Sequence, residues 1–380
     1  MIYLKEIILK KLQSNPVAQQ MLQFGNNIGN LFPNEEALCM ASAFMQDKQT
    51  RIVVKKNRYE AQQLYQRLKP LVEDTLLFVM EESLRVQAIA SSPEDKQEQL
   101  YVLTQLVKED KPRIIICNTA AFLRYLPDKE LFKSLCFKFE VDQEITMAEL
   151  KQKLNRAGYT KVNYVDRPCT YASRGGIVDV YCLEYEHPIR IEFFDTVIES
   201  IRLFHEETQR TIQTIDSVLI NPATDLLFTD DQIEYLQKEI DSELKKQQAK
   251  LIQDDYEFLL DYIEKDKISI ENYDIDPHLY IYFSYLNANK LTDYVNGHII
   301  FSSQEEVENG YKKLNEETIS FIQEMVESHQ YLPKYSMFHD IFTFEKEHTI
   351  QMFHDFLDFK HPIFSKIETL EKSDQPLIQI

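Results

Sequence analysis

The sequence predicts an α/β domain built on a parallel sheet, together with a smaller, β-rich α+β domain inserted into it. Apolar runs alternate with amphipathic helical segments from the N-terminus to about Leu126, which is typical of a parallel sheet covered by helices. Between Tyr171 and Arg210, apolar and polar residues alternate between turn signals, which indicates a half-buried antiparallel sheet. The length of 380 residues is enough for two or three domains, each with its own core.

The first domain is predicted to alternate helices with buried strands. Asn34 is the expected N-cap of the second helix, because its short polar side chain can accept a backbone N–H and acidic residues follow it. The run Arg113–Cys117 (RIIIC) is apolar enough for a strand covered on both faces. Helices are expected at 4–12, 35–45, 58–68 and 94–108, and strands at 51–54, 75–80 and 113–117.

The pattern changes after Leu126-Pro127-Asp128, where the second domain is expected to begin. Thr146 and Glu149 form a capping-box signature for a helix, and Gly158 is its expected terminator. Strands are expected at 135–141, 176–182, 188–194 and 197–204. In the last of these strands, strict alternation places Arg202 on one face. The residues expected on the other face are Val197, Glu199, Ile201 and Leu203.

The exposed face of this predicted sheet carries arginines and an aromatic residue. Arg190 and Phe194 lie on the same side of one strand, and Arg174 can reach them from the loop before the first strand. Arginine beside an aromatic ring on a rigid surface is typical of a protein-binding hot spot. The sequence therefore predicts a protein-docking face.

The same stretch resembles a module of a known family. The pattern YASRGGIVDV, followed by PIRIEFF, IESIRLF and TQR, is similar to the domain of bacterial transcription-repair coupling factors (Mfd) and of the excision-repair protein UvrB. In that family the domain docks onto UvrA, the damage-recognition ATPase. The departures are His205, where an aspartate is usual, and Thr196-Val197, where an acidic pair is usual.

The resemblance implies which residues contact UvrA. Arg174, Arg190 and Phe194 match the family's contact positions, while Arg202 and Arg210 are weaker candidates that internal ion pairs would explain equally well. Arg174 has an alternative role as a brace for the glycine turn that follows it. The resemblance further implies that the full-length protein masks this face until its motor engages DNA.

The N-terminal region resembles half of a RecA-type, UvrB-like motor domain whose nucleotide site has degenerated. IVVKKNRYEAQQLYQRL is similar to the strand and helix that follow a Walker A loop. The matching loop lacks the phosphate-binding lysine, carries proline in place of glycine, and places glutamates where a triphosphate would be repelled. Its residues are Asn30, Pro33, Asn34, Glu35 and Glu36.

The second half of the nucleotide site is also changed. The segment Leu279–Ser303 resembles the region that ends in the Walker B strand, where Asp-Glu would hold magnesium and position water. Ser302 and Ser303 occupy those positions. We therefore expect no nucleotide cofactor and no enzymatic activity in this chain, whereas the full-length family is an ATP-dependent DNA translocase whose motor motifs do not occur here.

The remaining segments complete the predicted organisation. Ser217 begins a run that resembles the strand returning to the first domain, and helices are expected at 230–251, continuing to about 264, and at 306–331. The predicted parts are 1–127 and 217–335 for the α/β domain, 128–216 for the inserted domain, and 336–380 for a tail leading to a linker domain.

Composition limits the function classes. The net charge of −20 opposes general adhesion to DNA, and the sequence lacks the apolar run of about eighteen residues that a membrane helix needs. The 5 cysteines include no CxxC pair, and His348, His354 and His361 lack a metal-ligand spacing, so we expect a cytoplasmic protein without a metal. The family also binds RNA polymerase and double-stranded DNA through domains not found here. The alternatives are a UvrB-type ATPase or helicase and a DNA-binding clamp.

Overall fold

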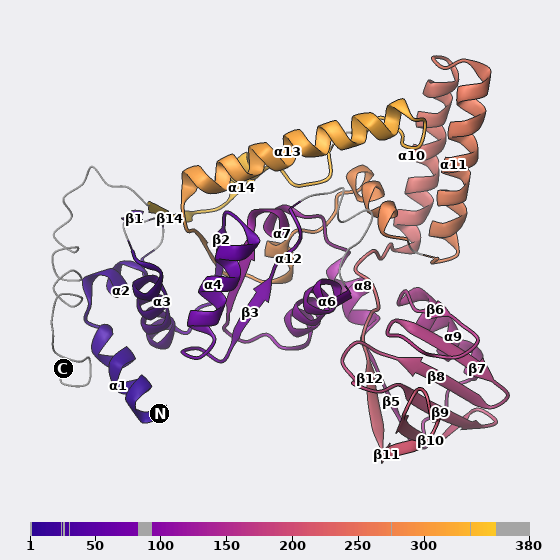
Figure 1. Cartoon of the computed structure of the whole chain (residues 1–380), viewed down its shortest axis with the longest axis horizontal. Helices are drawn as coiled ribbons and strands as arrows, with labels where there is room; N and C mark the ends of the chain where they lie inside the picture. Colours follow the sequence, from indigo (N-terminus) through magenta and orange to yellow (C-terminus); the bar gives the residue numbers. More distant parts are fainter. Residues whose placement is uncertain are drawn as a thin grey trace.

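The computed structural model describes residues 2–23, 25, 27–29, 31–82, 93–274, 276–334 and 336–354. Figure 1 shows an α/β part around a parallel sheet, a β-rich domain beside it, and a helical hairpin that projects from the same end. This is the mixed α/β and antiparallel architecture that the sequence predicts. Among the described residues, no helix combines the length and the apolar character needed to cross a membrane.

The α/β part is organised on a six-stranded sheet in which every described pairing is parallel. Central strands β2 and β4 are buried along their whole length, as expected when helices cover both faces. In spatial order the strands are β1 (Asn27–Gly29), β14 (Ile350–His354), β13 (His298–Phe301), β2 (Arg51–Lys55), β4 (Ile114–Asn118) and β3 (Thr75–Phe78).

Two hydrophobic cores lie on opposite faces of this sheet. Successive residues of β2 point to opposite faces and so pack in different cores: Val53 packs in one, while Ile52 and Val54 pack in the other. The first core is formed with α1 (Ile2–Leu12), α2 (Pro16–Gln20), α3 (Pro33–Asp47) and α4 (Arg58–Leu68). The second includes α6 (Pro93–Lys108), α7 (Thr119–Leu123), α12 (Leu291–Tyr294), α13 (Gln304–Glu327) and α14 (Ile341–Glu347).

The start of α3 differs from the sequence prediction. Phe32, rather than Asn34, is the N-cap residue, and Pro33 occupies the first helical position, where its missing N–H costs nothing. The Glu35 carboxylate accepts the backbone N–H of Phe32 at 3.0 Å. Asn34 instead accepts a hydrogen bond from Arg67 Nε at 3.0 Å. The proline therefore decides where the helix begins.

The parallel sheet extends beyond residue 335, where the sequence placed the last boundary. Strand β14 lies between β1 and β13 and pairs with both, Ile299 with Ile350 and Asn27 with Met352. The segment expected to be a tail thus supplies a strand inside the sheet up to His354. Residues 355–380 are outside the described part of the chain.

The inserted domain contains a second six-stranded sheet and a two-stranded ladder. Helix α8 (Lys129–Ser134) precedes it, and α9 (Met147–Arg156) begins at the predicted capping box of Thr146 and Glu149. Gly158 follows α9 with φ +82°, a conformation that favours glycine. The sheet runs in the order β11 (Thr211–Ile215), β10 (Val197–Phe204), β9 (Ile189–Phe194), β8 (Ile177–Tyr181), β7 (Thr170–Arg174) and β6 (Thr160–Lys161).

Three local predictions for this domain were wrong. Arg174 is the last residue of β7 rather than part of a loop. The register of β10 shifts between Ile198 and Ser200, so a bulge at Glu199 breaks the strict alternation and buries both Ile198 and Ile201. The run from Ser217 forms β12 (Ser217–Ile220), which pairs with β5 (Phe137–Glu140) inside this domain instead of returning to the first.

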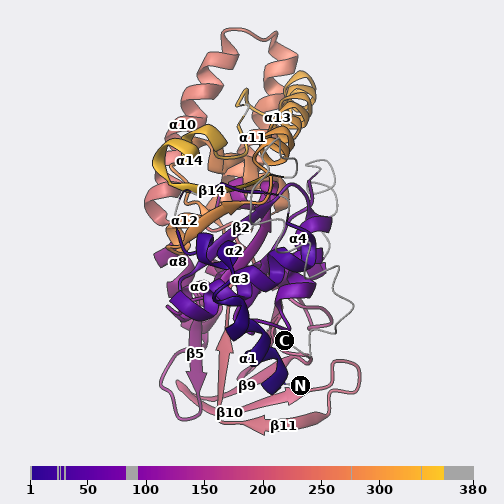
Figure 2. The ribbon, with the colours of Figure 1, turned by 90° about the vertical axis from the view of Figure 1, so that its left-hand side faces the viewer.

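A helical hairpin follows the inserted domain. Helices α10 (Asp230–Gln248) and α11 (Gln253–Glu271) pack side by side and project away from the sheet, as both views show (Figures 1 and 2). Helix α10 ends at Gln248 rather than at the predicted residue 251, and α11 continues to Glu271, beyond the predicted end near residue 264. A 3-10 segment, Pro277–Tyr285, then leads back to the parallel sheet.

Candidate protein-docking face

The outer face of the inserted sheet is the side turned away from its core. Across neighbouring strands, Ala172 lies opposite Asp179, Asp179 opposite Arg190, and Arg190 opposite Arg202. Since these side chains alternate with the buried Ile189 and its neighbours, the whole row belongs to the outer face. The next row contains Arg174, Ile177, Glu192 and Ser200. The sheet thereby brings Arg174, Arg190 and Arg202 together on one face.

Arg190 is held rigidly on this face. Its Nε and Nη2 donate to the two carboxylate oxygens of Asp179 at 2.7 and 2.8 Å, and Nη2 also donates to Gln209 Oε1 at 2.7 Å. The guanidinium lies over the ring of Phe204, 4.3 Å from the ring centre. The hydrogen bond to Asp179 raises the pKa of Arg190 further above its ordinary value. The charge is therefore fixed in place before any partner arrives.

Arg202 and Arg210 occupy different settings. Arg202 forms an ion pair with Glu192, whose carboxylate also accepts the Ser200 hydroxyl at 2.7 Å. Burial acts to raise the pKa of Glu192, but the bonds from Ser200 and Arg202 outweigh it and lower that pKa. Arg210 is exposed at the turn before β11, where its carbonyl accepts the His205 N–H at 3.0 Å.

Phe194 and Arg174 are exposed, like Arg210, but lie at the ends of strands of the sheet. Phe194 ends β9 with 74% of its surface exposed, directly before a tight turn in which Asp195 has φ +57°. The Arg174 guanidinium donates through Nε and Nη2 to the Asn163 carbonyl oxygen, at 3.2 and 2.5 Å. Arg174 therefore braces the preceding loop rather than the turn at Gly175. An exposed phenylalanine next to ordered arginines is suited to binding a protein with an apolar pocket and carboxylates.

In the segment that resembles a nucleotide site, the carboxylate of Glu36 accepts hydrogen bonds from two of the chain's own side chains. Lys55 Nζ donates to both carboxylate oxygens of buried Glu36, at 2.7 and 2.9 Å, and the Ser302 hydroxyl donates to Glu36 at 3.0 Å. Lys55 ends β2, Glu36 lies in the first turn of α3, and Ser303 caps α13. A cavity of about 410 Å³ adjoins this cluster. Asn30, the first residue of the predicted loop, lies outside the described residues.

Comparison with known proteins identifies the inserted domain. Residues 137–226 match the UvrB interaction domain family. The chain is 32% identical over 300 residues to the transcription-repair-coupling factor of Bacillus subtilis, which covers 76% of this chain. The corresponding proteins of Staphylococcus haemolyticus and Staphylococcus aureus are 28% and 26% identical over 308 residues, or 79% of this chain. The chain is a relative of the transcription-repair coupling factors.

The similarity covers only part of each coupling factor. The chain spans about a quarter of the length of these coupling factors, 25% of the Bacillus protein and 26% of the Staphylococcus proteins. The matched UvrB interaction domain begins at β5 and extends past β12. It therefore includes the whole outer face, together with the ladder that the sequence had divided between domains.

Sequence reasoning missed the partners that order the arginines of the UvrB interaction domain. Asp179 holds Arg190, and Glu192 holds Arg202, through contacts between neighbouring strands, and Gln209 in a turn also holds Arg190. Alternation along β8 could have placed Asp179 on the same face as Arg190 once the pairing was assumed. Gln209 offered no comparable signal, because it lies in the turn before β11 with φ +58°.

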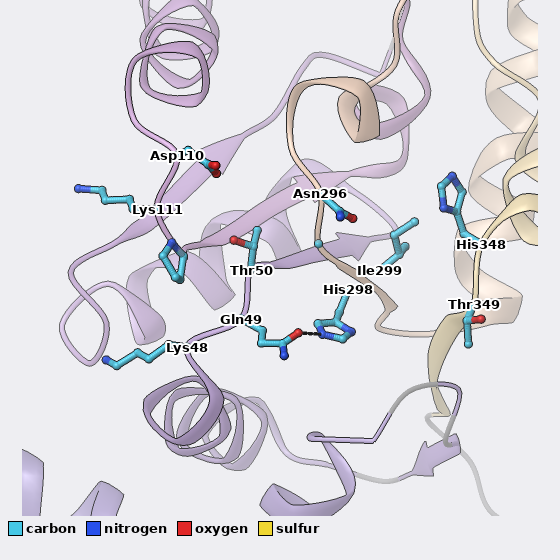
Figure 3. A pocket seen from close by; sticks show the side chains of 12 residues that line it. Lys48, Gln49, Thr50, Asp110, Lys111, Asn296, His298, Ile299, His348 and Thr349 are labelled. Atoms are coloured by element: carbon cyan, nitrogen blue, oxygen red, sulfur yellow. Dashed lines mark hydrogen bonds between the residues drawn. The ribbon is translucent and has the colours of Figure 1, made fainter.

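A separate cavity of about 430 Å³ lies at the end of the parallel sheet where strands β2, β4, β13 and β14 begin (Figure 3). In its lining, the side chains of His298 and Gln49 are hydrogen-bonded to each other, with Nε2 and Oε1 2.6 Å apart. Burial, with the nearby charge of Arg51, lowers the pKa of His298 to about 4. A neutral histidine adds no positive charge here near neutral pH, so the charged side chains of the lining are those of Lys48, Lys111 and Asp110.

Proposed function

We propose that this chain docks UvrA through the outer face of its UvrB interaction domain, and so recruits the damage-recognition ATPase in transcription-coupled excision repair. The observation that carries the proposal is the exposure of Phe194, at 74%, on the face where Arg190 and Arg202 are already ordered. Other parts of a longer coupling factor would bind RNA polymerase and double-stranded DNA, and one of them would mask this face.

The physical basis is preorganisation. Because Arg190 is fixed by Asp179 and Gln209 in the free chain, little side-chain freedom remains to be lost when a partner binds. Phe194 can enter an apolar pocket, while guanidinium groups donate charge-assisted hydrogen bonds to carboxylates around it. The surface of UvrA that binds here should therefore be acidic around an apolar centre.

Calorimetric titration of UvrA into the chain tests this proposal. Replacing Phe194 with alanine, or Arg174 with alanine, should each weaken binding by about 2 kcal/mol or more, the loss typical of a hot-spot residue. Phe258→Ala is the matched control, because Phe258 is also exposed (54%) but lies on the hairpin helix α11. The control should bind like the wild type. Absence of wild-type binding, or equal losses in all variants, would overturn the proposal.

We also propose that the α/β part binds no nucleotide. The Glu36 carboxylate already satisfies Lys55 and Ser302 at the start of α3, where a phosphate would need those donors. Thermal unfolding should therefore occur at the same temperature with and without millimolar Mg·ATP. A stabilisation that grows with ATP concentration would contradict this and favour a UvrB-type ATPase.

A further inference from the structure

Few large apolar side chains are exposed in the described part of the UvrB interaction domain. They are Tyr164 (59% exposed), Phe194 (74%) and Ile212 (49%). Ile212 lies on β11 next to a register shift in its pairing with β10. Phe194 belongs to the proposed docking face, which leaves Tyr164 as an exposed aromatic residue with no assigned role.

The loop that carries Tyr164 lies on the outer face of the sheet. Val162 and Val165, on either side of Tyr164, pack with Ala172 and Phe204. Ala172 is in the same cross-strand row as Asp179 and Arg190, and Phe204 lies under the Arg190 guanidinium, so both belong to the outer face. Since the two valines point to the sheet, the exposed ring of Tyr164 is on the solvent side of the loop.

Arg174 connects this loop to the docking face. Its guanidinium donates to the carbonyl oxygen of Asn163, the residue before Tyr164, at 2.5 and 3.2 Å. The exposed ring and the arginine are thus fixed in one local arrangement. Tyrosine is well suited to an interface, because its ring has few rotatable bonds and its hydroxyl can donate to a partner's carboxylate.

We propose that Tyr164 is a further contact residue for UvrA, and that the docking face extends from Phe194 and the arginines onto the loop Val162–Val165. This proposal rests on the proposed function above. It predicts that UvrA contacts the ring of Tyr164 with an apolar surface close to the carboxylates that receive Arg174. Arg174 then acts both as a contact and as a positioning residue for the loop.

Titration of UvrA into Tyr164→Ala and Tyr164→Phe variants of the chain tests the extension. The alanine variant should bind at least tenfold more weakly, because the ring is lost, whereas the phenylalanine variant should lose less because it keeps the ring. Tyr59→Ala and Tyr235→Ala are matched controls: their tyrosines are 69% and 47% exposed but lie on α4 and α10. Both controls should bind like the wild type.

The outcomes separate this inference from the proposed function. Wild-type affinity in Tyr164→Ala, alongside weakened binding in Phe194→Ala, would overturn the role of Tyr164 and leave the docking proposal standing. If the wild-type chain does not bind UvrA, both are overturned. If Tyr59→Ala loses as much affinity as Tyr164→Ala, the loss is not specific to the loop and the inference is also overturned. Thermal unfolding of each variant checks that it remains folded.

Discussion

Replacing Glu36 with alanine is expected to lower the free energy of unfolding by about 3–5 kcal/mol, the usual cost of leaving one charge of a buried ion pair without its partner. The side chains of Glu36 and Lys55 are only 7% and 10% exposed. The variant would leave the Lys55 ammonium and the Ser302 hydroxyl without the carboxylate to which both donate. Chemical denaturation followed by circular dichroism measures the change.

Two further variants identify the cause of that loss. Glu60→Ala removes a carboxylate that pairs with Lys56 at the surface, where both side chains are about one-third exposed, and should cost less than about 1 kcal/mol. Adding Lys55→Met to Glu36→Ala should restore much of the stability, because no buried charge is then stranded. If the double variant loses as much free energy of unfolding as the single variants Glu36→Ala and Lys55→Met added together, packing rather than charge is responsible.

Replacing Arg124 with alanine is expected to cost a comparable amount, about 3–5 kcal/mol of unfolding free energy. Buried Arg124 donates to Asp225 and, at 2.5 Å, to Gln99, and its guanidinium lies over the ring of Tyr280. Asp225 belongs to the UvrB interaction domain, whereas Gln99 and Tyr280 lie outside it. The variant would leave the Asp225 carboxylate buried without its cation at the junction of the two domains.

Arg156→Ala is the matched control for that junction. Arg156 also forms an arginine–aspartate pair, with Asp230 at 2.6 Å, but the two side chains are 32% and 70% exposed. Its loss should be less than about 1 kcal/mol because solvent screens the pair. Equal denaturation midpoints for Arg124→Ala and the wild type would refute the importance of the buried contact. The same titration with UvrA would show whether a weakened junction also affects docking.

The sequence predicted those elements that have a strong local pattern. Helix α4 was predicted with its observed ends from the helical spacing of its apolar residues, and the structure shows that Asn57 caps it. The capping box of α9 was equally informative. By contrast, the bulge at Glu199 and the partner of β12 depend on pairing with distant strands, which local alternation does not contain.

The candidate site was only partly predictable for the same reason. Alternation placed Arg190 and Phe194 on one face of β9, and the observed burial pattern agrees. The hydrogen bonds that Arg190 donates to Asp179 and Arg174 donates to Asn163 join separate strands or loops, so only the folded chain specifies them. Tyr164 was not singled out, because a lone tyrosine in a loop has no periodicity that would indicate whether it is buried or exposed.

The position of β14 has a consequence for synthesis on the ribosome. Strand β1 lies at the end of the sheet order and pairs with β14, which in turn separates it from β13. Roughly 320 residues lie between these partners, so at typical bacterial elongation rates β1 would leave the ribosome roughly 15–65 s before β14 is made. During that interval β1 presents unpaired N–H and C=O groups that could join another strand, and the adjacent edge of β13 does so in the shorter time between its own synthesis and that of β14. The nascent chain therefore depends on its last described strand to close a sheet that its first described strand begins.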